Sequence, residues 1–467
     1  MPWLQVVRGF LLRIVRPAQL GVFALFGLAY ANSFNGAFQF DDFNVIVEYA
    51  AVHSLNGWLS ELGQGIRPLL KFTYLLNWIS GAGVPGFHAV NLLIHGASVW
   101  LVYRLTQEFL KTKNRLQRVP LAPLLSAAFF ALHPVNTEAV TYISGRSSAL
   151  MALFYLCGLL VYVSGPVRSG PWRARILVPL CFVMALATKE SAVTFPLALF
   201  LWDISSGENW KTSLRKGWTS WLTLVIAAAF FLGNDAYRAA VERSTHFNSL
   251  TGNLATQTHA LLYLFRQWTL PFWLNMDPDL LVQRDFSDSG LELGFVFVLA
   301  WVMVVTWRKR PWIGFALAWA FLHLSLLYVF VPRLDIANER QWYLAAWPLG
   351  MALAVELLLY LSQRMAAGVS ILLLLGMATL TFLRNQDYQS EVSLWEQTVQ
   401  VSPGKSRVHG NLGYAYQLAG QTVQARLEYL QALRLDPDNV KARLNLRRLN
   451  AERAKPNGET RPQLPSQ

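Results

Sequence analysis

The chain has 467 residues, of which 54% are hydrophobic and 14% are charged, and its formal net charge at pH 7 is +13. Soluble domains carry about 25% charged residues, so this composition excludes an ordinary soluble protein and indicates a membrane protein with several spans. The basic residues form short clusters between apolar runs, a pattern that favours membrane orientation over nucleic-acid binding. The two cysteines, Cys157 and Cys181, lie within apolar runs and indicate packing rather than disulfides.

Apolar runs predict about eleven membrane spans, because a helix crosses the roughly 30 Å hydrocarbon core with about 20 apolar residues. The first run ends in an Ala-Tyr-Ala sequence that resembles a signal-peptidase site, and we interpret it as a retained helix. The segment 259–274 is expected to be re-entrant or interfacial. The predicted spans are 19–34, 87–107, 121–132, 147–164, 175–188, 191–203, 218–234, 290–307, 311–331, 341–360 and 368–383.

The positive-inside rule orients these spans. With the N-terminus in the cytoplasm, the loops richest in Lys and Arg all fall on the cytoplasmic side. The outer face then holds scattered single charges, and ionisable groups collected near a bilayer predict a functional site. The predicted outer segments are 35–86, 133–146, the turn around Lys189, 235–289, 332–340 and everything after 384.

Two adjacent carboxylates, Asp41 and Asp42, follow the first span in the outer loop 35–86. Such a pair can bind a divalent cation, act as a general base, or cap a helix that begins near Asn44. A cap explains one carboxylate only. A base suits a hydroxyl that attacks a sugar carbon while a phosphate departs, with cations stabilising the phosphate charge.

Basic side chains on the same predicted face suit a phosphate or diphosphate. The expected phosphate-binding residues are Arg67, Arg146, Lys189 and Arg340. The alternative pairs Lys189 with Glu190, and Arg340 with Glu339, as structural ion pairs. His88 and His95 share a helix face, where hydrogen-bonding histidines are favoured over a metal site. The supporting residues are His88, His133, Glu138, Glu190 and Glu339.

The polar region after residue 384 matches the tetratricopeptide pattern of about 34 residues. Pro403 lies 34 residues before Pro437, and one full repeat is flanked by two halves. About three repeats normally stand alone, so this region is expected to lean on the membrane domain, dimerise or bind a partner; a helical hairpin capping the last span is the alternative. The predicted domains are a transmembrane domain at 1–384, repeats at 385–451 and a disordered tail at 452–467.

An ordered set of motifs resembles the transmembrane and tetratricopeptide-repeat O-mannosyltransferases and their bacterial relatives. The motifs are "FDD", "RPLLKFTYLLNW...GFHAVNLLIH", "ALHPVNTEAVTYISGRSSALMALFYL", "KESAVTFPLALFLWD", "ANERQWYL" and "RNQDYQSEVSLWEQTVQVSP...NLGYAYQLAG". The resemblance implies an all-α membrane bundle of the GT-C type, a polyprenyl-phosphate sugar donor, and an acidic motif in the first outer loop. It points to Asp41 as the base, with Asp42 orienting or binding the acceptor.

The expected function is an inverting glycosyltransferase that moves a sugar from polyprenyl phosphate to a hydroxyl, such as Ser or Thr of an exported protein. A polyprenyl-lipid flippase or transporter, and a membrane scaffold that recruits partners through its repeats, are the alternatives. The expected partners are the lipid-linked sugar, the acceptor protein and membrane lipid, without nucleic acid; a divalent metal is the candidate cofactor. The short loops and tail, without an endoplasmic-reticulum retention signal, favour a bacterial inner membrane with periplasmic active site and repeats.

Overall fold

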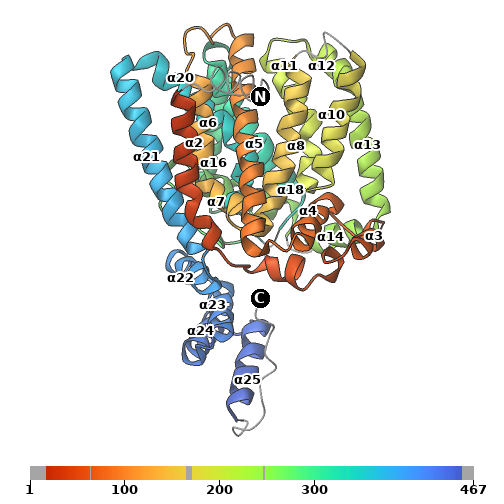
Figure 1. The fold of residues 1–467 in the computed structure, drawn as a ribbon, viewed down its shortest axis with the longest axis vertical. Coiled ribbons are helices and arrows are strands. Elements are labelled where there is room, and N and C mark those ends of the chain that lie inside the picture. The colour runs from red at the N-terminus through yellow and green to blue at the C-terminus, as the bar shows by residue number, and fades with distance from the viewer. Residues whose placement is uncertain (1–16, 64, 165–170, 246–247, 334, 455–467) are drawn as a thin grey trace, which may run out of the picture. The chain divides into compact units, whose positions relative to one another are not determined.

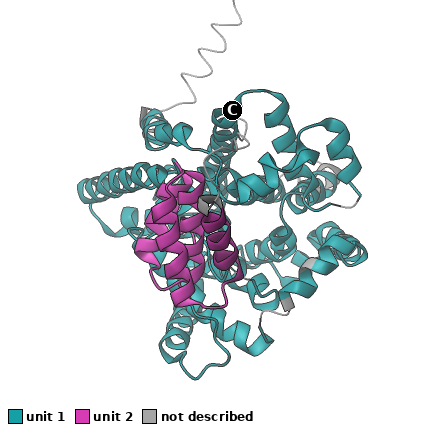
Figure 2. Ribbon diagram, turned by 90° about the horizontal axis from the view of Figure 1, so that it is seen from below, with its two compact units in different colours: residues 1–274, 280–389 teal, residues 275–279, 390–467 magenta. Residues whose placement is uncertain are grey.

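The computed structural model describes residues 17–63, 65–164, 171–245, 248–333 and 335–454, and every regular element in these ranges is helical. The chain divides into two compact units (Figure 2). Met1–Leu274 and Leu280–Gln389 form the first, here called the membrane unit. Asn275–Asp279 and Ser390–Gln467 form the second, the C-terminal unit. The all-helical fold class is therefore confirmed.

Long apolar helices build the membrane unit and run along a common direction (Figure 1). α8 packs against α5 and α10, α6 against α20, and α2 against α21. The longer helices are α2 (Pro17–Tyr30), α5 (Gly83–Thr112), α6 (Ala122–Leu132), α8 (Arg146–Val163), α10 (Pro171–Leu186), α11 (Phe195–Ser205), α13 (Trp218–Gly233), α15 (Leu250–Thr269), α16 (Gly290–Lys309), α17 (Pro311–Phe321), α20 (Trp347–Tyr360) and α21 (Gln363–Asp387).

Further helical elements connect these helices, and three of them carry the predicted site residues Glu138, Glu190, Glu339 and Arg340. They are η1 (Ala31–Asn35), η2 (Phe43–Val47), η3 (Ala50–Val52), α3 (Leu55–Glu61), α4 (Pro68–Ile79), η4 (Pro134–Asn136), α7 (Thr137–Val140), η5 (Ile143–Gly145), η6 (Glu190–Thr194), α12 (Trp210–Lys216), α14 (Asp235–Thr245), η7 (Leu322–Leu326), α18 (Leu327–Phe330), η8 (Glu339–Gln341) and α19 (Trp342–Ala345). Helix α4 begins directly after Arg67, which is its N-cap residue.

Large aromatic side chains fill the core of the membrane unit. Trp319 and Trp347 are fully buried, and their ring centroids lie 5.4 Å apart. The indole of Trp319 also donates a hydrogen bond of 2.9 Å to the carbonyl of Leu344. An aromatic pair of this kind contributes about 0.5–1.5 kcal/mol beyond the burial of its area, so this cluster fixes α17 against α19 and α20.

Within the part of the chain that the structure describes, four helical segments are long and apolar enough to cross a membrane, and the number is six if each of two bent pairs counts as one span. The prediction of about eleven spans is not confirmed. One reason is length: α6 has 11 residues, which at about 1.5 Å per residue reach about half of the roughly 30 Å core. The four segments are Ile143–Val163, Gly290–Lys309, Pro311–Phe330 and Gln363–Asp387, and the bent pairs are Trp210–Lys216 with Trp218–Gly233 and Glu339–Ala345 with Trp347–Tyr360.

Besides Asn275–Asp279, the described part of the C-terminal unit contains four helices, each packed on the next: α22 (Glu391–Val401), α23 (Ser406–Leu418), α24 (Thr422–Leu435) and α25 (Val440–Ala454). Ser390 caps α22 by accepting a hydrogen bond of 3.1 Å from the N–H of Ser393. Gly413 lets α23 approach α24, because a Cβ at this position would lie 2.7 Å from the ring of Tyr429. The tetratricopeptide assignment of this unit and the disorder of 452–467 stay predictions.

We expect Gly413→Ala to loosen the hairpin of α23 and α24, since the added methyl group would collide with Tyr429. Overpacking of this kind costs about 1–3 kcal/mol, so hydrogen exchange of both helices in the full-length protein should accelerate. Gly410→Ala is the matched control on α23, because its nearest neighbour atom would lie 3.8 Å away and the alanine gains about 0.5–1 kcal/mol of helix stability. Equal exchange in both variants would contradict the packing described above.

Candidate active site

The segment 35–86, predicted to be the first outer loop, lines a cavity of about 440 Å³ in the membrane unit. Two carboxylates, Asp41 and Asp335, line it together with a larger set of basic side chains. Those basic residues are Arg67, Lys71, Lys189, Arg333 and Arg340. Cations outnumber carboxylates on this wall, and clefts lined mainly by one sign of charge attract the opposite charge. The cavity is therefore suited to an anion.

The adjacent residues Asp41 and Asp42 have different surroundings. Asp42 is fully buried. One of its oxygens accepts a hydrogen bond of 3.0 Å from the N–H of Gln39, and the other accepts from the N–H of Ser144 at 2.8 Å and from the Ser144 hydroxyl. Burial raises the pKa of Asp42 to about 7 despite these bonds. Asp42 thus ties the acidic loop to the segment before α8, whereas Asp41 lines the cavity.

The backbone and the carboxyl group of Asp41 have different interactions. Its N–H donates a hydrogen bond of 2.9 Å to the hydroxyl of Tyr142. Burial raises the pKa of the Asp41 carboxyl, the positive charge of Arg340 opposes this rise, and the negative charge of Asp335 adds to it. A carboxylate whose pKa is raised towards the working pH accepts a proton more readily than an ordinary one.

Strained backbone flanks the cavity. Phe40 has φ of 44° and Arg67 has φ of 56°, and Asn114 is the only other non-glycine residue with positive φ in the described ranges. The left-handed conformation costs an L-residue roughly 1–2 kcal/mol, and Pro68 restricts Arg67 further. Such strain tends to persist at functional sites. In this site the strained residues are Phe40, which directly precedes Asp41, and Arg67 itself.

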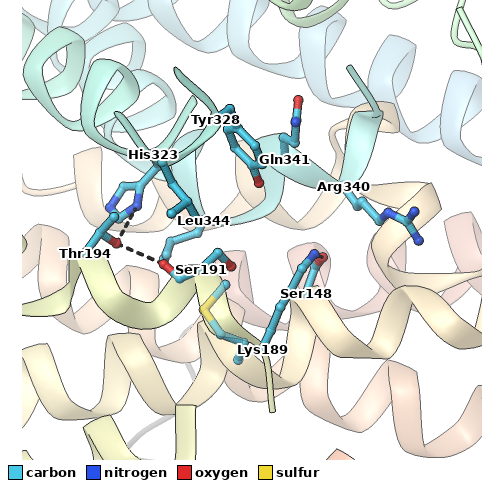
Figure 3. A pocket seen from close by; sticks show the side chains of 11 residues that line it. Ser148, Lys189, Ser191, Thr194, His323, Tyr328, Arg340, Gln341 and Leu344 are labelled. Carbon is cyan, nitrogen blue, oxygen red and sulfur yellow. Dashed lines mark hydrogen bonds between the residues drawn. The ribbon is translucent and has the colours of Figure 1, made fainter. Parts of the chain in front are cut away.

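Arg67 and Lys189 reach the cavity from different elements. Arg67 forms a forked ion pair with Glu190, with Nε to Oε1 at 2.9 Å and Nη2 to Oε2 at 2.7 Å. Glu190 therefore pairs with Arg67 rather than with its neighbour Lys189. Lys189 donates a hydrogen bond of 2.7 Å to Ser148, and these two side chains lie close together in Figure 3.

Lys189 and Arg340 also line a small polar cavity of about 20 Å³, in which Thr194 lies between His323 and Ser191 (Figure 3). A space of this size holds about one water molecule. Burial lowers the pKa of Lys189 well below its usual range, and the positive charge of Arg340 lowers it further. Binding of an anion would oppose both effects, so the site favours an anionic ligand.

Arg340 is paired with a residue that lies far from it in the sequence. Its Nε lies 3.3 Å from Oε1 of Glu138, and its N–H donates a hydrogen bond of 2.9 Å to Oε2 of the same carboxylate. Glu339 does not pair with Arg340 but lies 3.0 Å from Arg384. Glu138 and Glu339 are both fully buried. These supporting residues therefore position cations.

Arg146 lies apart from the other predicted phosphate-binding residues. It is fully buried and is not among the residues that line the cavity. Its Nε donates to Asn91 at 2.6 Å, and its Nη2 donates to the carbonyl of Phe87 at 3.0 Å. The guanidinium group also lies 5.0 Å from the ring centroid of Tyr74. These contacts of Arg146 join α4, α5 and α8. Its surroundings are therefore those of a residue that supports helix packing.

The predicted histidines lie in the protein interior. His133 contacts the carbonyl of Trp268 at 2.9 Å, and His95 contacts the hydroxyl of Tyr343 at 2.8 Å. His88 is buried and lies close to Gly36. A Cβ added to Gly36 would lie 2.9 Å from Nε2 of His88. Among the described residues, no three His, Cys, Asp or Glu side chains gather as metal ligands.

Residues missed by the sequence reasoning complete the wall. Arg333 and Asp335 come from the loop before η8, and Tyr49 and Lys71 come from the first outer loop. Both loops fall on the predicted outer face, so membrane topology was the available signal. Topology predicts the side of the membrane on which a residue lies. It cannot identify which charged residues line the same cavity.

A second cavity of about 790 Å³ adjoins the first and shares part of its wall, including Arg67, Lys189, Arg333 and Asp335. Its remaining wall is largely apolar and comes from η6, α13, α14, α18 and the following segment. The apolar lining residues are Val193, Phe231, Leu232, Val241, Leu327, Val331 and Pro332. Leu232 is 72% exposed. The two cavities together suit an amphiphile with an anionic head group.

We expect Asp42→Asn to destabilise the protein at pH 8, where Asp42 is ionised. The amide NH₂ would face an N–H donor in place of an acceptor, which costs about 1–3 kcal/mol. Asp41→Asn is the matched control and should leave stability unchanged or raise it. Thermal unfolding in detergent, followed by tryptophan fluorescence, tests this difference; equal losses would contradict the structural role of Asp42.

The chain is similar to proteins that are named protein O-mannosyl-transferases. No protein-family model and no solved structure matches the chain. It is 24% identical to "Protein O-mannosyl-transferase F38B6.6" of Caenorhabditis elegans, over 88% of this chain and 61% of that protein. It is 25% identical to "Protein O-mannosyl-transferase Tmtc3" of Drosophila melanogaster, over 82% and 50%.

Human "Protein O-mannosyl-transferase TMTC3" is 22% identical over 90% of this chain and 51% of its own length. The chain thus spans about half to three-fifths of the curated relatives it matches. The resemblance expected from the ordered motifs is confirmed: the curated homologues of this chain are protein O-mannosyltransferases of the transmembrane and tetratricopeptide-repeat family.

Proposed function

We propose that this chain is an integral-membrane inverting glycosyltransferase that moves a sugar from a polyprenyl-phosphate donor to a hydroxyl of an exported protein. One observation carries the proposal: Asp41 shares a cavity with Arg67, Lys189 and Arg340, and this cavity adjoins a larger apolar one. The relatives named as protein O-mannosyltransferases support transfer to protein, with mannose as the first sugar to test.

In the proposed step, Asp41 accepts the proton of the acceptor hydroxyl as its oxygen attacks the anomeric carbon. The new carbon–oxygen bond forms while the bond to the phosphate oxygen breaks, and polyprenyl phosphate leaves with that electron pair. Attack from the opposite face inverts the anomeric centre. Arg67, Lys189 and Arg340 stabilise the charge that grows on the departing phosphate, as fixed charges do in catalysis.

Two carboxylates support these cations. Glu190 orients Arg67 through a forked pair, and Glu138 orients Arg340. Preorganised donors need little rearrangement during the reaction. Arg146 has no direct phosphate contact in this mechanism, and Asp42 fixes the loop that carries Asp41.

The second cavity is proposed to receive the polyprenyl chain. Its apolar wall offers the burial that an isoprenoid needs, and the cations that both cavities share support a position for the phosphate at their junction. In this proposal the fold is of the GT-C type with about eleven spans, some tilted or partly inserted. The active site and the tetratricopeptide repeats face the periplasm of a bacterial inner membrane, with the N-terminus in the cytoplasm.

We expect Asp41→Asn to lower the transfer rate by at least about 100-fold, since a positioned base contributes roughly that factor or more. The assay follows mannose transfer from polyprenyl phosphate to exported proteins by intact mass. Asp288→Asn, at an exposed carboxylate, is the matched control and should stay fully active. Full activity of Asp41→Asn, or donor translocation by the parent protein without a covalent product, would contradict the proposal.

The pH dependence of transfer tests the same residue. Asp41 must be ionised to act as base, so activity should fall as the pH drops through its pKa. Burial and Asp335 raise that pKa above the ordinary value, which is about 3.9 for Asp. Asp335→Asn removes one of these causes and should move the fall to lower pH; an unmoved profile would contradict the assignment of Asp41 as the titrating group.

A further inference from the structure

The loop between α15 and α16 contributes five residues to the C-terminal unit. Asn275–Asp279 groups with the helices that follow Ser390, although more than one hundred residues separate the two segments. Asn275 is 1% exposed and Asp277 is 4% exposed. In this segment of sequence Asn-Met-Asp-Pro-Asp, the first four residues are buried and Asp279 is exposed.

Asp277 is held by two cations from one short stretch of the C-terminal unit. Arg407 binds it in a fork, with Nε to Oδ2 at 2.7 Å and Nη2 to Oδ1 at 2.5 Å. Lys405 donates to Oδ1 at 2.6 Å and also to the carbonyl of Pro278 at 2.7 Å. Forked Arg–carboxylate pairs are among the strongest and most directional hydrogen bonds in proteins.

Ser402 contacts the segment on both sides of Asp277. Its hydroxyl oxygen accepts a hydrogen bond of 2.6 Å from the amide group of Asn275 and one of 3.0 Å from the N–H of Asp279. Asn275 also accepts a hydrogen bond of 3.1 Å from the N–H of Asp277, which shapes the segment into a turn. Ser402, Lys405 and Arg407 thus contact an amide side chain, a carboxylate and the backbone of the segment. A peptide-binding site makes contacts of the same kinds.

We propose that Ser402, Lys405 and Arg407 form a peptide-binding site for an acidic segment, and that its ligand is Asn275–Asp279 of the same chain. The segment is tethered at both ends, so its effective concentration at the site is high. The contact acts as an ionic latch that holds Asn275–Asp279 against the stretch from Ser402 to Arg407 within the C-terminal unit. This proposal does not depend on the proposed function.

The test compares Asp277→Asn with Asp279→Asn in the full-length protein in detergent. Both variants remove one negative charge, but only Asp277 holds the two cations; Asp279 is exposed. Hydrogen exchange should rise at least tenfold across 275–279 and 402–407 in Asp277→Asn, with 422–435 still protected because the unit remains folded. Asp279→Asn should match the parent protein. Equal exchange in the two variants would overturn the latch.

A second set of variants separates a specific pair from general loosening. Arg407→Gln should accelerate exchange of the same segments as Asp277→Asn. When both substitutions are combined, Arg407→Gln should add little, because its partner is already lost; such non-additivity identifies directly interacting residues. Full additivity, or loss of protection over 422–435 in each single variant, would overturn the proposal in favour of a general folding defect.

Discussion

Charge pairing inside an apolar bundle is the constraint on which the site depends. A charge buried without a partner costs several kcal/mol, so buried cations near the cavity need polar or acidic partners that hold them. Glu190 holds Arg67, and Glu138 holds Arg340. These acids keep positive charge fixed at the wall of a cavity whose lining remains cation-rich. Lys189 has a hydroxyl partner instead, so its ammonium group gains most from an arriving anion.

The ion pairs also show what sequence reasoning can and cannot predict. Adjacency suggested pairing Lys189 with Glu190, and Arg340 with Glu339. Neighbours along a chain do not face each other, and the observed partners come from distant segments. The sequence predicted Asp41, Arg67, Lys189 and Arg340, which line the cavity, but it did not predict Lys71, Arg333 and Asp335. Which carboxylate pairs with which cation depends on tertiary packing. A local sequence pattern does not predict that packing.

The same limit separates Asp41 from Asp42 and sets Arg146 apart. All three carry charge on the predicted outer face, yet only Asp41 lines the cavity. Backbone donors from Gln39 and Ser144 surround Asp42, and aromatic rings enclose Arg146. The helical class was predictable because apolar runs are local features. The span count was not, since the run at 121–132 forms a helix too short to cross alone.

Glu339 and Arg340 make a final connection within the membrane unit. Although the two residues are adjacent in the chain, their side chains have different partners. Arg340 pairs with Glu138 beside the cavity, and Glu339 pairs with Arg384 near the end of α21. Arg384 also lies 2.9 Å from Asp387, three residues before the C-terminal unit begins at Ser390. One dipeptide thus ties a cation of the cavity to the helix that leads into that unit. A shift of α21 cannot leave Glu339 in place without separating a buried ion pair, so the position of Arg340 depends on the last helix of the membrane unit.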